Sequence, residues 1–205
     1  MNRKLIRKLH IVGFLILLPL IALILWYSGF DYEGASHDEK IFKESYESYN
    51  LKKNENNEEY LKVNITKDNK IEYIDVDTAI SKLNKGTSLI FMGSPKDSMS
   101  RAYVETIINT ITELNVDKLY YLEISYEEEK DYSKLVSAVG ENTLILPRID
   151  AIRNGEVIGV IENIFEDGQD INKGLNEEQK KDLKNAIKVL VDDLNKNDNV
   201  CNEEC

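Results

Sequence analysis

The stretch Ser88-Leu-Ile-Phe-Met-Gly-Ser-Pro-Lys-Asp-Ser-Met-Ser-Arg101 decides the fold of this chain, and residues 102–115 continue it. Leu89 to Met92 form a short apolar run, which is typical of a buried strand, and Gly93-Ser94-Pro95 ends it. Apolar residues then recur at helical spacing at Ala102, Val104, Ile107, Ile108, Ile111 and Leu114. We therefore predict a strand, a tight turn and a helix. The turn then lies at the helix N-terminus, where free N–H groups and the helix dipole favour negative charge.

This corner resembles the active-site corner of the thioredoxin-like superfamily. In that family a C-x-x-C motif lies at the turn, so that the helix N-terminus stabilises a thiolate. Alignment on the Gly-x-Pro turn and on the basic residue after the motif places Asp97 at the first cysteine and Ser100 at the second. We call residues Asp97, Ser98, Met99, Ser100 and Arg101 the degenerate turn. It has the frame of the motif without the sulfur, so redox activity is not carried over to it and we assign no catalytic residue.

The N-terminal segment differs from the rest of the chain. A basic cluster without acidic residues is formed by Arg3, Lys4, Arg7 and Lys8. Residues 11–30 are then almost uncharged and apolar, and twenty helical residues reach about 30 Å, the thickness of a bilayer core. We predict an uncleaved signal-anchor, with residues 1–10 in the cytoplasm and the rest of the chain outside. The alternative is a cleaved signal peptide, for which Gly34-Ala35-Ser36 is a weak cleavage candidate.

Net charge limits the classes of partner. The chain carries −11 and the first thirty residues contribute +4, so the remainder carries −15. Such a domain repels nucleic acid and anionic lipid head groups, and we expect neither as a partner. The part beyond the predicted anchor holds one histidine, His37, so neither a Ser-His-Asp site nor a zinc site is expected, and no cofactor is predicted.

The rest of the chain divides by composition. Residues 31–59 are polar and end in an Asn-rich run, so we interpret them as a stalk or linker with a helix over about 39–51 that packs loosely if at all. Residues 60–197 carry the patterns of one domain, and residues 198–205 form a tail. Strands are expected at 60–65, 70–74, 89–92, 118–124, 148–153 and 156–161, and helices at 75–84, 102–115, 132–139 and 176–196.

The order of these elements extends the resemblance over about Ile71 to Leu194. Leu146-Pro147 takes the place of the family's cis-proline, which faces the C-x-x-C turn, and Arg153-Asn-Gly-Glu156 matches the hairpin that follows it. The resemblance implies an α/β fold, with a central mixed sheet flanked by helices and a groove between the degenerate turn and Leu146–Pro147. It is closest to membrane-anchored thioredoxin-like proteins of Gram-positive bacteria, some of which are labelled bacteriocin-transport accessory proteins.

Two polar features need an interpretation of their own. Asp97 suits a helix N-cap, with a role in binding a ligand or partner as the alternative, and Ser100 suits a small polar filler. Asp150 falls inside an otherwise apolar strand, where a carboxylate needs partners. Alternation along the strand places Arg148 on the same face as Asp150 and Arg153 on the other.

Both cysteines, Cys201 and Cys205, lie in the last five residues. In an oxidising compartment such a pair predicts a local disulfide, and two alternatives stay open: an exchange-competent pair and links to other chains. The loop is so short that a bridge removes little entropy from the unfolded chain. Glu203 and Glu204 raise the pKa of the thiols, which disfavours a strong nucleophile.

These observations favour a membrane-anchored extracytoplasmic module that binds a protein or peptide without catalysis. The first alternative is a thiol–disulfide oxidoreductase that works through Cys201 and Cys205. The second is a structural subunit of an envelope or export complex.

Overall fold

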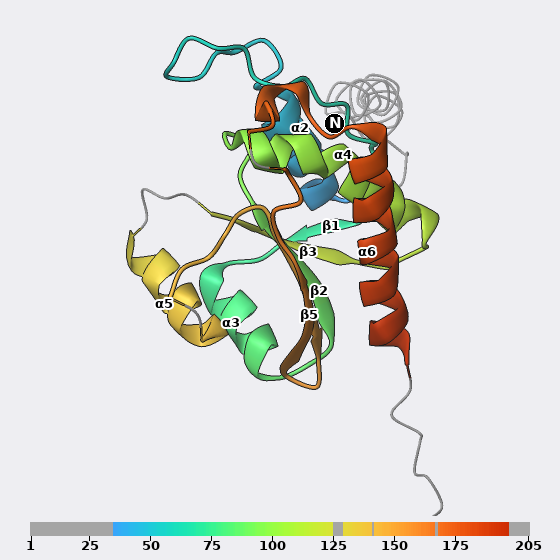
Figure 1. Ribbon diagram of the computed structural model, residues 1–205. Coiled ribbons are helices and arrows are strands. Elements are labelled where there is room, and N and C mark those ends of the chain that lie inside the picture. The colour runs from blue at the N-terminus through green and yellow to red at the C-terminus, as the bar shows by residue number, and fades with distance from the viewer. Residues whose placement is uncertain (1–34, 125–128, 141, 167, 197–205) are drawn as a thin grey trace, which may run out of the picture. The chain divides into compact units, whose positions relative to one another are not determined.

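The computed structural model describes residues 35–124, 129–140, 142–166 and 168–196 (Figure 1). Their strands form a five-stranded sheet in the order β1-β3-β2-β4-β5. Strands β1, β3 and β2 run parallel, whereas β4 pairs antiparallel with both β2 and β5. In chain order the elements are α2 (His37–Glu47), β1 (Ile71–Tyr73), α3 (Val76–Asn84), β2 (Ser88–Gly93), α4 (Ser98–Glu113), β3 (Leu119–Glu123), α5 (Glu129–Val139), β4 (Arg148–Arg153), β5 (Glu156–Ile161), the 3-10 helix η1 (Ile171–Lys173) and α6 (Glu177–Asn195).

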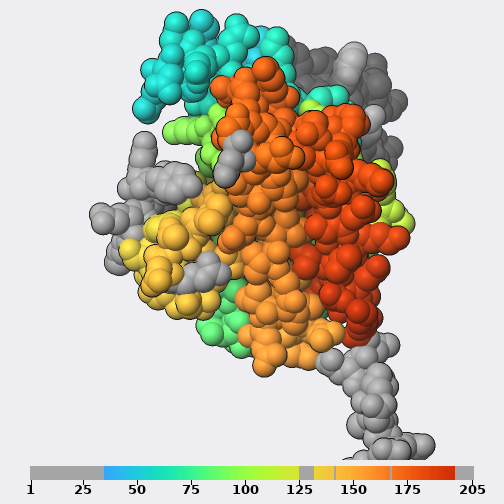
Figure 2. Space-filling model, in the orientation of Figure 1, coloured from blue at the N-terminus to red at the C-terminus, as the bar shows by residue number. Residues whose placement is uncertain are grey.

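Helices cover both faces of the sheet (Figure 1). On one face α2, α4 and α6 form a core with Phe91 of β2, and on the other α3 and α5 pack over Ile90 and Met92. All six residues of β2 are buried, because the strand lies between two neighbours and under helices on both sides. The visible surface in Figure 2 shows the β4–β5 hairpin and the orange segment after it between α5 and α6. The predicted α/β class, with a mixed central sheet flanked by helices, is confirmed.

Helix α2 belongs to the core, and the prediction of a loosely packed stalk is wrong for this part of residues 31–59. Phe42 and Tyr46 are fully buried, and the Phe42 ring meets the Tyr121 ring edge-on with 4.8 Å between centroids. The helix starts at a capping box between Ser36 and Glu39, a signal that lies within the sequence as an S-x-x-E pattern. Burial of two large aromatic rings explains why this polar segment joins the domain.

The first turn of α2 also covers the outer edge of β1. The main-chain N–H of Tyr73 donates to the Asp38 carboxylate at 3.0 Å, and the N–H of Lys70 donates to Glu39 Oε1 at 2.9 Å. An edge strand otherwise presents free main-chain groups to solvent. Side chains of α2 therefore stand where a further strand would pair.

The strand predicted at 60–65 does not form, although Val63 and Ile65 are buried as its alternation requires. Both main-chain groups of Val63 bond to the Asn50 side chain, at 2.9 and 2.7 Å. The N–H of Ile65 donates to Glu47 and its carbonyl accepts from Lys43, at 2.9 and 2.6 Å. Side chains of α2 and of the turn after it bond to the main-chain groups that a partner strand would otherwise satisfy. The alternation of apolar residues therefore predicts correctly which side chains of 60–65 are buried, but not that the segment pairs with another strand.

The hairpin and the start of α6 agree with the sequence. Asn154 and Gly155 occupy the β4–β5 turn with φ of 53° and 81°, as an Asn-Gly turn requires. A side chain on Gly155 would meet the Asn84 carbonyl at 2.4 Å, so only glycine fits. Helix α6 begins with the expected capping box of Asn176 and Gln179.

Among the described residues, no helix has both the length and the apolar character that a membrane crossing requires. The predicted cytoplasmic segment 1–10, the predicted span 11–30 and the tail with Cys201 and Cys205 lie outside the described residues.

Candidate functional site

The degenerate turn links the end of β2 to the start of α4. Asp97 is the N-cap of α4, and its carboxylate accepts from the main-chain N–H of Ser100 at 2.6 Å and from the Ser100 hydroxyl at 2.7 Å. The N-cap interpretation of Asp97 therefore fits the geometry. Ser98 and Met99 are half-buried on the first turn of the helix.

Ser100 is fully buried behind the turn. Its hydroxyl donates to Asp97 and accepts from the main-chain N–H of Ser94 at 3.2 Å. A Cβ placed on Gly93 would stand 2.8 Å from this hydroxyl, so the two chain segments meet closely. Both hydrogen bonds of this hydroxyl stabilise the turn, so Ser100 fits the interpretation as a small polar filler better than a role as a nucleophile.

Arg101 is buried, with 1% of its surface exposed, and it holds three segments together. Its Nε donates to the Leu61 carbonyl at 2.8 Å, and Nη2 donates to Asn50 Oδ1 at 2.8 Å. Its Nη1 donates to the carbonyls of Tyr46 and Pro95 at 2.7 and 3.1 Å. Burial lowers the pKa of this guanidinium. Sequence reasoning missed the role, because main-chain acceptors leave no mark in the amino-acid sequence.

Leu146–Pro147 lies directly before β4, the strand that pairs with β2. The peptide bond between the two residues is cis, as the resemblance implied. Because Met92 pairs with Arg148, the register sets Pro147 opposite Gly93, the last residue of β2. The β2–α4 turn and Leu146–Pro147 therefore meet at the same end of the sheet.

Main-chain groups next to Pro147 are available for pairing. Within the described part of the chain, neither the N–H nor the C=O of Leu146 has a hydrogen-bond partner. Leu146 is 5% exposed, while the neighbouring side chain of Ile145 is 47% exposed. Most buried main-chain polar groups in proteins are paired, so these two groups are unusual.

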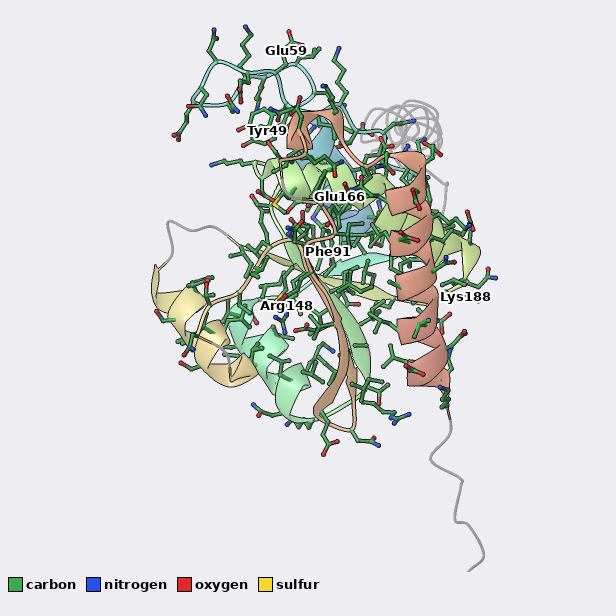
Figure 3. The ribbon with its side chains drawn as sticks, viewed as in Figure 1. Tyr49, Glu59, Phe91, Arg148, Glu166 and Lys188 are labelled. Carbon is green, nitrogen blue, oxygen red and sulfur yellow. The ribbon has the colours of Figure 1, made fainter. Side chains whose placement is uncertain are left out.

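Arg148 and Asp150 form a buried ion pair on the face covered by α3 and α5, and they share that face as the alternation predicted. Figure 3 labels Arg148. Arg148 Nε donates to Asp150 Oδ1 at 2.7 Å, and Nη1 donates to Glu162 Oε1 at 2.5 Å. Glu162 was not foreseen as a partner, because it lies beyond the end of β5. The pair adjoins Pro147 and fixes the start of β4.

Two tyrosines connect α2 to the end of β2. The Tyr121 hydroxyl donates to the Gly93 carbonyl at 3.1 Å and lies 3.4 Å from the Tyr46 hydroxyl. Burial raises the pKa of both hydroxyls well above the usual value, so both stay protonated and able to donate. Beside Gly93 in the sheet, partial burial raises the pKa of the Glu123 carboxyl, and Lys96 opposes that rise.

The unpaired main-chain groups of Leu146 are suited to hydrogen bonds with the main chain of another segment. The Ser100 hydroxyl and the Asp97 carboxylate are already hydrogen-bonded to each other within the degenerate turn. In the ranges that the structure describes, no three His, Cys, Asp or Glu side chains gather in a group that could hold a metal ion. No model of a known protein family matches the chain, and no curated protein matches it.

Proposed function

We propose that this chain is a membrane-anchored, extracytoplasmic thioredoxin-like protein that lacks the active-site dithiol and binds an extended protein or peptide segment without catalysis. The strand order β1-β3-β2-β4-β5 and the β2–α4 corner support the thioredoxin-like assignment. The cis Leu146–Pro147 bond beside that corner supports it further. Asp97 and Ser100 stand where the family has cysteines, so the proposal is for binding and not for redox chemistry.

The observation that carries the proposal is the pair of unpartnered main-chain groups at Leu146, next to the degenerate turn. An extended segment that pairs with them would satisfy both groups, as in β-strand addition. The exposed Ile145 side chain offers apolar contact beside them. Recognition through main-chain groups suits a partner that is defined by an extended conformation more than by one particular sequence.

Residues 11–30 support the membrane part of the proposal through their length and apolar composition. The basic cluster before them favours a cytoplasmic N-terminus. In intact cells, an added protease is expected to digest residues 35–196. In a separate sample without protease, the intact chain is expected to remain in the membrane fraction after alkaline washing. Protection of the domain, or its release by the wash, would contradict the anchor.

The binding test uses the full-length chain in detergent micelles and a fluorescein-labelled unfolded polypeptide, reduced and carboxymethylated α-lactalbumin. Fluorescence anisotropy measures the Kd. Ile145→Asp is expected to weaken binding at least tenfold, because a charge stands next to the pairing groups. Val189→Asp is the matched control, since Val189 is an apolar side chain of α6 that is 57% exposed. Equal affinity of wild type and Ile145→Asp would overturn the proposal.

The same assay separates the two alternatives. A Cys201→Ser/Cys205→Ser variant is expected to bind the probe as wild type does, and neither form is expected to reduce a model disulfide. Exchange activity that disappears in the double variant would make the tail the active site. A purely structural subunit predicts no saturable binding of the probe by the wild-type chain.

A further inference from the structure

A pocket of about 130 Å³ lies away from Leu146–Pro147, between the segment Leu61–Val63, α4 and the start of α6. In Figure 2 the cyan segment after α2, the orange segment before α6 and the start of α6 gather at the upper end of the view. The cationic residues that line the pocket are Lys62, Arg101, Lys173 and Lys180, and Glu105 is the acidic residue among its lining. Such a concentration of positive charge is unexpected in a domain that carries −15.

Arg101 contributes a buried charge that the described residues balance only in part. Its four hydrogen bonds end on three carbonyls and one amide oxygen, and no described carboxylate lies within 4.0 Å of it. The Tyr46 carbonyl belongs to the last turn of α2, and a helix C-terminus supplies the equivalent of about half a negative charge. The Tyr60 ring, whose centroid lies 5.5 Å from the guanidinium carbon, adds a cation–π contact. Buried charges are normally paired with an opposite charge, and no described carboxylate supplies one here.

The lysines around the pocket can reorient toward a ligand. Lys62 is exposed and makes no ion pair within the described ranges. Lys173 lies 3.6 Å from Asp170, and Lys180 lies 2.7 Å from Glu177. Both pairs are exposed contacts within one turn of chain, and such pairs contribute little stability and exchange readily with other partners.

Glu105 can offset only one of these cations. Its carboxylate accepts a hydrogen bond from the main-chain N–H of Asn64, and it forms no ion pair with a described lysine or arginine. The pocket lining therefore carries four cationic side chains and one carboxylate, and the pairs of Lys173 and Lys180 with Asp170 and Glu177 are exposed contacts that a ligand can displace. An excess of this size favours a dianion over a single carboxylate.

We propose that this pocket binds the phosphate group of a small ligand, with Arg101 at its wall and Lys62, Lys173 and Lys180 around the opening. Arginine and lysine are the usual partners of phosphate oxygens. The charge of −15 on the domain repels polyanions and anionic bilayers, so a soluble phosphate ester is expected to bind better than a lipid head group. Arg101 also belongs to the degenerate turn, but the main-chain groups of Leu146 that carry the peptide-binding proposal are not part of this pocket.

The test is titration calorimetry of the full-length chain in non-ionic detergent with inorganic phosphate, at an ionic strength held constant with chloride. Wild type is expected to show saturable binding at one site. A Lys62→Gln/Lys180→Gln variant is expected to bind at least tenfold more weakly. The control Lys85→Gln/Lys188→Gln removes the same charge from exposed lysines outside the pocket and is expected to change the Kd less than twofold. Arg101 is left intact, because it holds the fold together.

No saturable binding by wild type, or equal weakening in the control variant, would overturn the proposal. Glycerol 3-phosphate and vesicles of phosphatidylglycerol identify the source of the phosphate group. Binding of either one that is lost in Lys62→Gln/Lys180→Gln supports the site, and glycerol 3-phosphate is the expected ligand of the two. The unfolded-polypeptide probe is expected to bind this variant as it binds wild type, so failure of one proposal is distinguishable from failure of the other.

Discussion

The two faces of the sheet each bury one arginine, and they balance it differently. Arg101, on the face of α2, α4 and α6, and Arg148, on the face of α3 and α5, are each 1% exposed. Arg148 contacts two carboxylates, Asp150 and Glu162. Among the described residues, Arg101 donates its side-chain hydrogen bonds to carbonyl and amide oxygens alone, and its guanidinium lies over the Tyr60 ring. Arg101 is the last residue of the degenerate turn and Arg148 directly follows Pro147, so the two arginines flank the candidate site.

This difference shows that a buried arginine can stabilise a fold in two ways, by pairing with a nearby carboxylate or by joining distant segments. Arg148 and Asp150 lie two residues apart on one strand, so their pair is local. Arg101 binds residues 40 to 55 positions away, besides Pro95, and therefore joins segments that no strand or helix connects. A carboxylate partner satisfies charge, whereas the planar guanidinium satisfies several carbonyls at once. The two arrangements should respond differently to substitution.

The largest effect is expected for Arg101→Met, which removes one donor from each of four acceptors and leaves the carbonyls of Leu61 and Pro95 with no other donor among the described residues. Each buried polar group left unpaired costs about 1–3 kcal/mol, so we expect a loss of about 4 kcal/mol in the free energy of unfolding. Urea unfolding followed by far-ultraviolet circular dichroism measures it. Arg101→Lys keeps the charge but not the fork of donors and is expected to lose most of the same stability. Wild-type stability in Arg101→Lys would show that charge alone matters here.

Asp150→Asn tests the other arginine and is expected to cost about 3 kcal/mol, because it removes a charge that faces buried Arg148. The loss is smaller because Glu162 remains. A double variant, Arg148→Met/Asp150→Leu, is expected to recover most of the loss, since apolar side chains often replace a buried ion pair at little cost. The same unfolding assay applies. If the double variant is no more stable than Asp150→Asn, the loss in Asp150→Asn does not come from the unbalanced charge of Arg148.

Asp97→Ala sharpens the comparison, because it loosens the start of α4 without touching the contacts of Arg101. Loss of the N-cap is expected to cost about 1 kcal/mol. Asp97→Asn is the control, since asparagine also caps helices and is expected to remain close to wild type. Thermal unfolding of the two variants side by side measures the difference. Equal losses in both would assign a role to the charge of Asp97 beyond capping.

The smallest effect is expected for Glu123→Gln, at the end of β3 beside Gly93. Partial burial raises the pKa of this carboxyl in the folded chain, so its ionisation penalises the folded state once the pH rises above the ordinary value of 4.5. Glu123→Gln should therefore be slightly more stable than wild type at pH 7 and equal to it below pH 4. A pH series of unfolding midpoints checks this. A gain that persists at pH 3 would exclude ionisation as the cause.

Much of the fold could be predicted because local patterns and tertiary structure agree. The run Leu89–Met92 predicts the central strand, and Asn154-Gly155 predicts the hairpin at the correct residues. Asp97 at the helix start is recognisable from capping chemistry alone. The cis bond at Pro147 followed from family resemblance and not from the residues around it.

The remainder depends on contacts that leave no local pattern. Residues 60–65 alternate like a strand, but side chains from α2 and the turn after it take the place of a partner strand. Helix α2 looks polar along most of its length, and two buried rings, Phe42 and Tyr46, decide its position. Arg101 reads in sequence as an ordinary basic residue, because carbonyl acceptors are present at every position of every chain.

The carboxylates that α2 sets against β1 bear on how this protein avoids self-association. A free strand edge invites another copy to add its own strand, which is a common route to aggregates. Asp38 and Glu39 occupy N–H donors at and just before β1 and add negative charge there. The addition of a strand from another copy at the β1 edge is therefore opposed in two ways. Two main-chain N–H donors are already occupied, and the carboxylates repel the negative charge of the other copy. Among the described strands, β5 at the opposite edge of the sheet is therefore the more favourable place for an intermolecular sheet to extend.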